Sequence, residues 1–313
     1  MARDDADDDR GWVLAAAMLP FPNQQDAPAE AWAAALRQVA RAGFTQVDPT
    51  DSWLRVADLD NARRDEFRAV VAEAGLTVPA VTTARRSVID PRDGADNLAY
   101  SHRVLDAAAE LGARHVSFSL MRPLTDAQRA VTWFWTVDGP RDPVDGSLWE
   151  LAVTRFRELG DHAASIGVEV SLECYEDTYL GTAADSVRLV EDIGSPAVGL
   201  NPDLGNLVRR QGPVEHWLDI IRAAAPHTRY WHVKNILRLE DPAAGVVLTA
   251  PAPLPSGVVD YRTAVAVVLE ARPDVAFCLE NYGGDGLAVS AANREYLLGL
   301  LPERGARTPG RDS

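Results

Sequence analysis

Four titratable side chains in the second half of the chain have the chemistry of metal ligands: Glu173, Asp203, His232 and Glu280. They stand in or just after four short apolar segments, which read VEVSLEC, AVGLNPD, RYWHVKN and VAFCLEN. A buried carboxylate without a partner is costly, and neighbouring carboxylates repel one another. One divalent cation would remove this conflict, and three carboxylates with one imidazole suit Mn²⁺, Mg²⁺ or Co²⁺. Zinc is also possible, although it is more often held by additional His or Cys.

Short apolar segments alternate with amphipathic ones along the whole chain, which is the pattern of a parallel sheet with connecting helices. Strands are predicted at residues 12–18, 44–49, 76–82, 114–120, 168–174, 197–203, 229–235 and 275–281. Helices are predicted at residues 29–42, 61–74, 95–111, 148–166, 183–193, 214–225, 261–271 and 289–301. Eight β/α units in one domain predict a closed (β/α)₈ TIM barrel. An open doubly wound sheet is the alternative, but Gly-x-Gly-x-x-Gly does not follow the first strand.

Polar and apolar residues alternate within the predicted strands. In the fifth strand Val170 and Leu172 share one face, whereas Ser171 and Glu173 share the other. One face of each barrel strand points into the lumen and the other toward the helices. The pattern therefore predicts a small, polar lumen whose potential ligands lie at the carboxyl ends of the strands, where TIM barrels have their active sites.

With SLECYED, GLNPDLGN, YWHVKN and CLEN in this order, the chain resembles the xylose isomerase-like TIM barrel superfamily from about Val13 to Leu301. The resemblance implies that the four residues named above hold one divalent ion, with Mn²⁺ the first choice. It also implies that Glu173 and Glu280 move the substrate proton. The expected function is a metal-dependent sugar isomerase or epimerase. It would act on a ketose or related polyol by proton transfer through a metal-stabilised enediolate.

Several substrate contacts are predicted beside these ligands. Arg238, six residues after His232, matches a substrate-contacting arginine of the keto-sugar epimerases. Those epimerases have a second glutamate at the position of Tyr179, so Glu176 is either its substitute or a solvated loop acid. Lys234 is expected to position a polar or anionic substrate group. The remaining predicted contacts are Asn206, which replaces a histidine of many relatives, and the loop residues Trp133 and Trp135.

Two long connections are expected to set specificity. Residues 121–147 include Trp133, Phe134 and Trp135, which predict a lid over a sugar, a stacking surface for an aromatic aglycone, or a subunit interface. The proline-rich loop LEDPAAGVVLTAPAPLPSG is interpreted as a second wall or a contact surface. Trp53 and Arg85 or Arg86 are predicted to line the same mouth.

Three other functions remain open. The first is a metal-dependent lyase acting on an oxidised (3-keto) sugar. It would resemble an inosose dehydratase or a C-glycoside deglycosidase catalytic subunit, which pairs with a small accessory subunit. The second is a barrel that binds without catalysis. The third, the endonuclease IV branch, needs further His and Glu ligands and is disfavoured by the net charge of −15.

Composition limits the partners and the compartment. The net charge of −15 argues against nucleic acid and anionic membranes, and no apolar run is long enough for a membrane span. Two cysteines imply no disulfide framework, so a cytoplasmic protein is predicted. The resemblance to this barrel superfamily implies a homo-oligomer. We expect disordered tails at 1–10 and 303–313 around one domain at 11–302. The other histidines are assigned no metal role: His102, His115, His162, His216 and His227.

Overall fold

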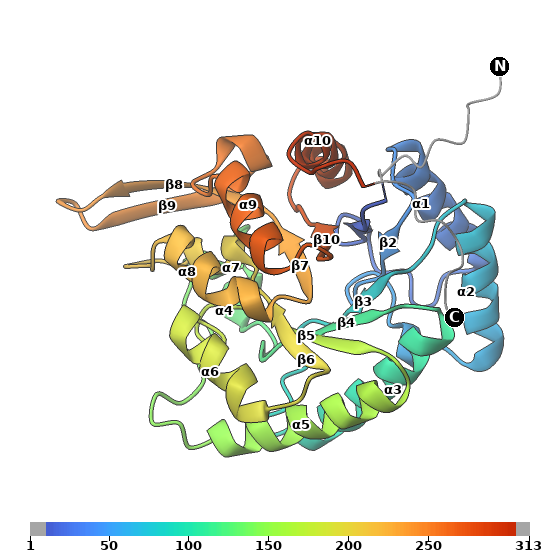
Figure 1. Ribbon diagram of the computed structural model, residues 1–313, viewed down its shortest axis with the longest axis horizontal. Helices are drawn as coiled ribbons and strands as arrows, with labels where there is room; N and C mark the ends of the chain where they lie inside the picture. Colours follow the sequence, from blue (N-terminus) through green and yellow to red (C-terminus); the bar gives the residue numbers. More distant parts are fainter. Residues whose placement is uncertain (1–10, 305–313) are drawn as a thin grey trace.

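The computed structural model describes residues 11–304, and in this range eight parallel strands form a barrel inside a layer of helices (Figure 1). The strands are β1 (Leu14–Ala17), β2 (Val47–Asp48), β3 (Ala80–Thr82), β4 (His115–Phe118), β5 (Glu169–Glu173), β6 (Val198–Asn201), β7 (Tyr230–Val233) and β10 (Ala276–Leu279). They pair in the orders β2-β1-β10-β7 and β3-β4-β5-β6. Parallel bridges from Thr50 to Thr82 and from Leu200 to Thr228 join the two groups at both seams. The predicted (β/α)₈ barrel is confirmed.

Each predicted helix has a counterpart in the outer layer. These are α1 (Ala29–Arg41), α2 (Asn61–Glu73), α3 (Gly94–Glu110), α5 (Trp149–Ser165), α6 (Ala183–Ile193), α8 (Trp217–Ala224), α9 (Tyr261–Ala271) and α10 (Gly286–Leu298). Short helices α4 (Asp126–Arg129) and α7 (Leu204–Val208) lie in the connections. Helix α10 begins three residues before its predicted start, because the Asp285 side chain accepts a hydrogen bond from the backbone N–H of Ala288 and caps the helix.

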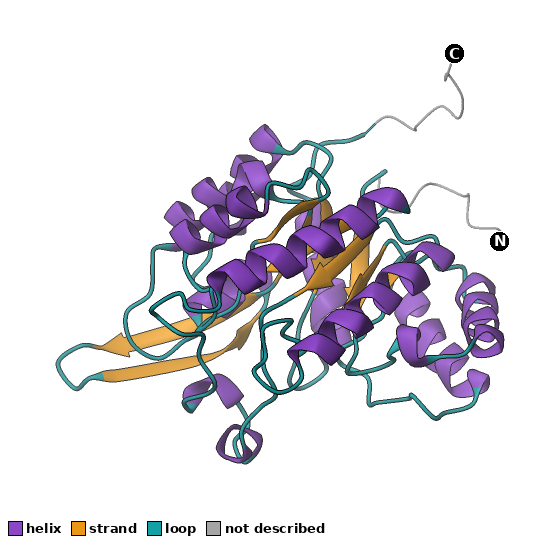
Figure 2. Ribbon diagram, turned by 90° about the horizontal axis from the view of Figure 1, so that it is seen from below, coloured by secondary structure: helices purple, strands orange, loops and turns teal. Residues whose placement is uncertain are grey.

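The connection after β7 differs from the prediction. The proline-rich loop is an antiparallel hairpin of β8 (Asn235–Asp241) and β9 (Val246–Ala252), which extends away from the barrel (Figures 1 and 2). Pro251, which favoured a loop in the sequence, is opposite Ile236 near the base of the hairpin. Polar and apolar residues alternate in parts of this segment, as in a strand, but its prolines favoured a loop in the prediction.

The barrel lumen is polar, as the alternation predicted. Ser117, Ser171 and Asn201 are fully buried, and Asn201 Nδ2 donates to Ser117 Oγ over 3.2 Å. The apolar side chains of the same strands pack with the helices in one large core cluster. Both cysteines, Cys174 and Cys278, are buried free thiols. This division leaves the lumen available for polar groups.

Two predictions concern the ends of the chain. The acidic tail at 1–10, and all but two residues of the tail at 303–313, lie outside the described residues. Along 11–304, none of the helices combines the length and the apolar character needed to cross a bilayer.

Candidate functional site

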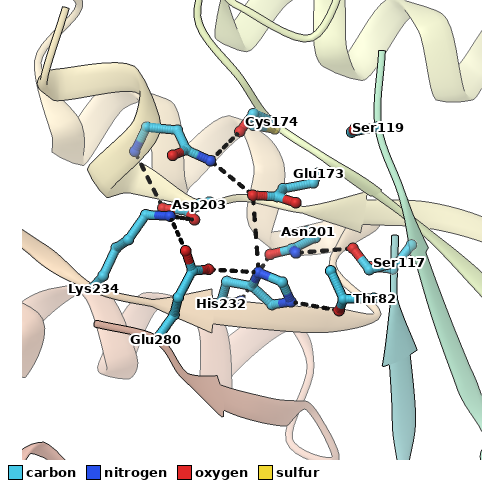
Figure 3. Close-up of polar contacts among 12 residues, drawn as sticks. Thr82, Ser117, Ser119, Glu173, Cys174, Asn201, Asp203, His232, Lys234 and Glu280 are labelled. Atoms are coloured by element: carbon cyan, nitrogen blue, oxygen red, sulfur yellow. Dashed lines mark hydrogen bonds and ion pairs between the residues drawn. The ribbon is translucent and has the colours of Figure 1, made fainter. Parts of the chain in front are cut away.

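The structure brings Glu173, Asp203, His232 and Glu280 together at the carboxyl end of the barrel (Figure 3). Glu173 ends β5, Asp203 follows β6, His232 lies in β7 and Glu280 follows β10. One nitrogen or oxygen atom of each lies within 4.8 Å of those of the other three, and all four side chains are buried. Three carboxylates and one imidazole at this spacing fit a single divalent cation. We call these four residues the interior quartet.

Lys234 and His232 are the cationic groups among these carboxylates. Lys234 Nζ lies 2.7 Å from both Asp203 Oδ2 and Glu280 Oε1. His232 Nδ1 lies 3.1 Å from Glu280 Oε2 and 3.9 Å from Glu173 Oε1. A cation held by the quartet would therefore share Asp203 and Glu280 with the lysine ammonium.

The surroundings shift the pKa values of the quartet in different directions. Burial raises the pKa of Glu173 to about 7, and it also raises the pKa of Asp203. Burial alone would raise the pKa of Glu280 too, but Lys234 and His232 hold it well below its ordinary value. Burial disfavours the imidazolium of His232, yet the adjacent Glu280 and Glu173 raise its pKa to about 9. The chain thus stabilises positive charge at this point.

Asn206 supports the quartet. Its Nδ2 donates to Glu173 Oε1 over 2.8 Å and to the carbonyl of Cys174 over 3.1 Å. Its backbone N–H donates to Asp203 Oδ1, so Asp203 caps α7 with one oxygen and faces Lys234 with the other. Asn206, predicted as a substrate contact, lines the cavity but directs its amide N–H groups at Glu173 and the backbone.

A hydrogen-bonded relay lies behind His232. His232 Nε2 is 3.2 Å from Thr82 Oγ1, which donates to Asp48 Oδ2 over 2.7 Å. Asp48 also accepts from Tyr230 Oη and from the backbone N–H of Thr82. Such partners fix the ring orientation of a metal-binding histidine. Nothing local in the sequence linked Asp48 to His232.

A cavity of about 720 Å³ opens above the quartet. Glu173, His232, Glu280 and Lys234 line it, and its mouth includes Arg85 and Arg86 as predicted. Its aromatic wall consists of Trp133, Phe134, Trp135, Tyr175 and Tyr282. Trp53 was predicted at this mouth but is buried elsewhere, where its ring packs with that of Phe67.

Trp133 and Trp135 stack in this wall with ring centroids 5.2 Å apart. Trp135 Nε1 donates to Thr249 Oγ1 on β9, so the hairpin supports the wall. Gly283, at φ 84°, lies against Trp133, and a Cβ there would be 2.5 Å from the indole. The backbone angle and the close approach both require glycine at this position.

Arg209 was missed in the sequence. It is 1% exposed and pairs with both oxygens of Glu176, over 2.8 and 3.1 Å. Its guanidinium lies about 5 Å from the ring centroids of Phe134, Trp135 and Tyr175. The Glu176 carboxylate is thus occupied by Arg209 and does not line the cavity, in contrast to its predicted substrate role. Arg209 is followed by Arg210, and two consecutive arginines in a sequence usually indicate solvent-exposed residues.

Arg238 does not line the cavity either. Its guanidinium donates to the carbonyls of Val208, Arg210 and Gly212 over 2.6–2.9 Å. These carbonyls belong to the end of the short helix α7 and to the residues that follow it, where no further helical turn supplies a backbone donor. Strand β8 directs Arg238 at them. Its observed role is to fasten the hairpin to this segment.

Comparison with known proteins identifies the family to which this (β/α)₈ barrel belongs. The family model of the xylose isomerase-like TIM barrel matches residues 36–298. The chain belongs to this family. A search of curated proteins gives no match.

Three solved structures illustrate the likeness. A xylose isomerase-like TIM barrel protein from Mycobacterium smegmatis, in complex with magnesium, is 44% identical, with a TM-score of 0.89 over 94% of this chain and 97% of that one. D-psicose 3-epimerase from Clostridium cellulolyticum, with D-tagatose, is 15% identical, with a TM-score of 0.62 over 92% and 96%. The probable 3-DHS dehydratase from Bacillus anthracis is 18% identical, with a TM-score of 0.60 over 84% and 92%. The last two show the shared fold.

Proposed function

We propose that the protein is a divalent-metal-dependent isomerase or epimerase that acts on a ketose or related polyol. The observation that carries this proposal is the pair Glu173 and Glu280, which flank His232 at the bottom of the cavity. The Mycobacterium smegmatis relative with magnesium supports a divalent ion, and the psicose epimerase neighbour supports a sugar substrate. The metal-loaded protein used in the experiment below is prepared with Mn²⁺, Mg²⁺, Co²⁺ and Zn²⁺ in turn, so that the ion preferred by the quartet is measured as well.

The two glutamates can divide the proton transfer between them. A bound divalent ion would act as a Lewis acid that polarises the substrate carbonyl. Lys234 and His232 hold the pKa of Glu280 well below its ordinary value, whereas burial raises the pKa of Glu173 to about 7. Two carboxyl groups with different proton affinities suit one base and one acid. Acid–base catalysis of this kind contributes about 10²–10⁴ in rate.

The aromatic wall favours a second candidate, a lyase that acts on a 3-keto glycoside. The cavity of about 720 Å³ lies in the range that encloses drug-sized ligands, and is larger than one sugar ring requires. Trp133 offers a flat surface on which a planar aglycone can stack. The probable dehydratase with this fold supports lyase chemistry as the second candidate. The same two glutamates would move the proton in either reaction.

Proton exchange with solvent separates these candidates. The metal-loaded protein is incubated in D₂O with a panel of ketoses and 3-keto glycosides, and products are followed by NMR. An isomerase or epimerase incorporates deuterium next to the carbonyl and forms an isomeric sugar, whereas a lyase releases the aglycone. Glu173→Gln serves as the control for exchange that does not depend on the site. If the protein binds no divalent ion, the proposal is wrong in both forms.

A further inference from the structure

Two histidines meet between helices α3 and α5, in the helical layer outside the barrel (Figure 1). His102 Nδ1 and His162 Nδ1 are 2.8 Å apart. Behind them, His102 Nε2 lies 2.9 Å from Glu158 Oε1, and His162 Nε2 lies 3.0 Å from Asp106 Oδ1. We call these four residues the outer histidine pair and its two carboxylates. They belong to the helical layer and do not line the cavity above the quartet.

The three contacts of this array need three protons. Ionised carboxylates only accept hydrogen bonds, so each Nε2 must carry a proton. Both Nδ1 atoms then present lone pairs to each other. Two neutral imidazoles supply two protons, and both are already used at the carboxylates. The contact between His102 and His162 therefore requires one additional cation, either a proton or a metal ion.

We propose that the outer pair binds a borderline divalent transition-metal ion such as Zn²⁺ through His102 Nδ1 and His162 Nδ1. Zinc–nitrogen bonds are about 2.0–2.1 Å long, so tetrahedral coordination places the two nitrogens about 3.3 Å apart. The present 2.8 Å has to open by about half an ångström, which one side-chain adjustment can provide.

The carboxylates and the exposure of the site support this assignment. A metal-bound histidine usually donates its other N–H to a carboxylate, and both histidines have that arrangement here. The His102 and His162 side chains are 27% and 23% exposed, so water can complete the coordination. Imidazole ligands suit Zn²⁺, Cu²⁺ and Ni²⁺, whereas Mg²⁺ prefers oxygen. The bound ion would join α3 to α5 and stabilise the folded chain, increasingly so as the free ion concentration exceeds its Kd.

Zinc titration of the full-length protein tests this proposal. Calorimetry is performed on the wild type and on Asp203→Ala, which disables the interior quartet. His102→Gln and His162→Gln are compared with His216→Gln, which removes an exposed imidazole elsewhere. We expect one zinc-binding event to survive in Asp203→Ala, to weaken by about tenfold or more in either pair variant, and to persist in His216→Gln. Circular dichroism verifies that each variant is folded.

Two further readouts distinguish coordination from a merely structural pair. With Cu²⁺ as the probe and Asp203→Ala as the background, electron paramagnetic resonance should show two nitrogen ligands when both histidines of the outer pair are present and one after His102→Gln. Glu158→Gln should weaken zinc binding by about tenfold while both nitrogens remain. Equal zinc binding in all the histidine variants would overturn the proposal. It would also be overturned if Asp203→Ala bound no zinc, because the middle contact would then hold a shared proton.

Discussion

The interior quartet and the outer histidine pair combine the same side-chain types in opposite arrangements. In the quartet three carboxylates and one imidazole face a common point, and Lys234 lies among them. In the outer pair two imidazoles face each other, and the carboxylates lie behind them. The first arrangement offers mainly oxygen ligands and the second mainly nitrogen. The same residue types thus suit hard ions in one place and borderline ions in the other.

Burial separates the two clusters further. The quartet side chains are almost inaccessible, whereas Glu158 and Asp106 are more than half exposed. Charges in the barrel are poorly screened by water, so their mutual repulsion is strong and a bound cation relieves more of it. At the outer pair the solvent already moderates each charge. We therefore expect substitutions in the quartet to have larger effects than those in the outer pair.

The largest effect is expected from Asp203. Asp203→Asn keeps an oxygen that can cap α7 but removes the charge from the quartet, and Asp203→Ala removes both. We expect either change to remove the bound divalent ion and to lower activity by about 10³-fold or more, because the Lewis acid is lost. Metal content by mass spectrometry and the initial rate provide the measurement. Stoichiometric Mn²⁺ or Mg²⁺ in Asp203→Ala would contradict the assigned ligand set, because the imidazoles of the outer pair do not favour these ions.

The next effect concerns the two proposed proton carriers. Glu173→Gln and Glu280→Gln should each lower kcat by about 10²–10⁴-fold, and the solvent-exchange step should slow equally. The matched control is Glu158→Gln, which neutralises a carboxylate beside a histidine in the outer cluster and should leave kcat unchanged. Normal deuterium exchange in Glu173→Gln would show that this residue does not carry the proton.

The third prediction compares the pKa values of two buried histidines, His232 and His115. Carboxylates raise the pKa of His232 to about 9, whereas burial, with Arg114 nearby, lowers the pKa of His115 to about 4. The unfolded chain binds a proton at His115 below about pH 6.5, but the folded chain does not until about pH 4. The contribution of His115 to stability should therefore fall by about 3 kcal/mol as the pH drops through this window.

His115→Gln tests that expectation. Urea unfolding of the variant and the wild type between pH 4 and 7 should show a flatter pH dependence in the variant. The slope is compared and not the absolute stability, because the substitution also removes the stacking of His115 on Tyr230. His216→Gln is the exposed control. Parallel curves for wild type and His115→Gln would mean that His115 titrates normally in the folded protein.

Local patterns in the sequence sufficed for the barrel and for the quartet. Strand alternation placed Glu173 and His232 on the lumen face, and the strand ends of a barrel meet at one mouth. Other contacts join residues distant in the chain, such as Glu176 with Arg209 and His102 with His162. These pairs leave no periodic signal. Arg238 was predicted as a substrate contact from the resemblance alone, whereas in the structure it lies in the hairpin and donates to backbone carbonyls.

Substitutions in the relay behind His232 should have the smallest of these effects. The relay also allows a comparison of how a carboxylate orients a histidine in the two clusters. Asp48 orients His232 through Thr82, whereas Glu158 contacts His102 directly. Asp48→Asn and Thr82→Val should weaken divalent-metal binding by about 10–100-fold without removing a ligand. Calorimetry with Mn²⁺ measures this change, and Ser117→Ala, a lumen substitution outside the relay, is the control. Unchanged affinity in Thr82→Val would show that packing around the ring is enough to orient His232.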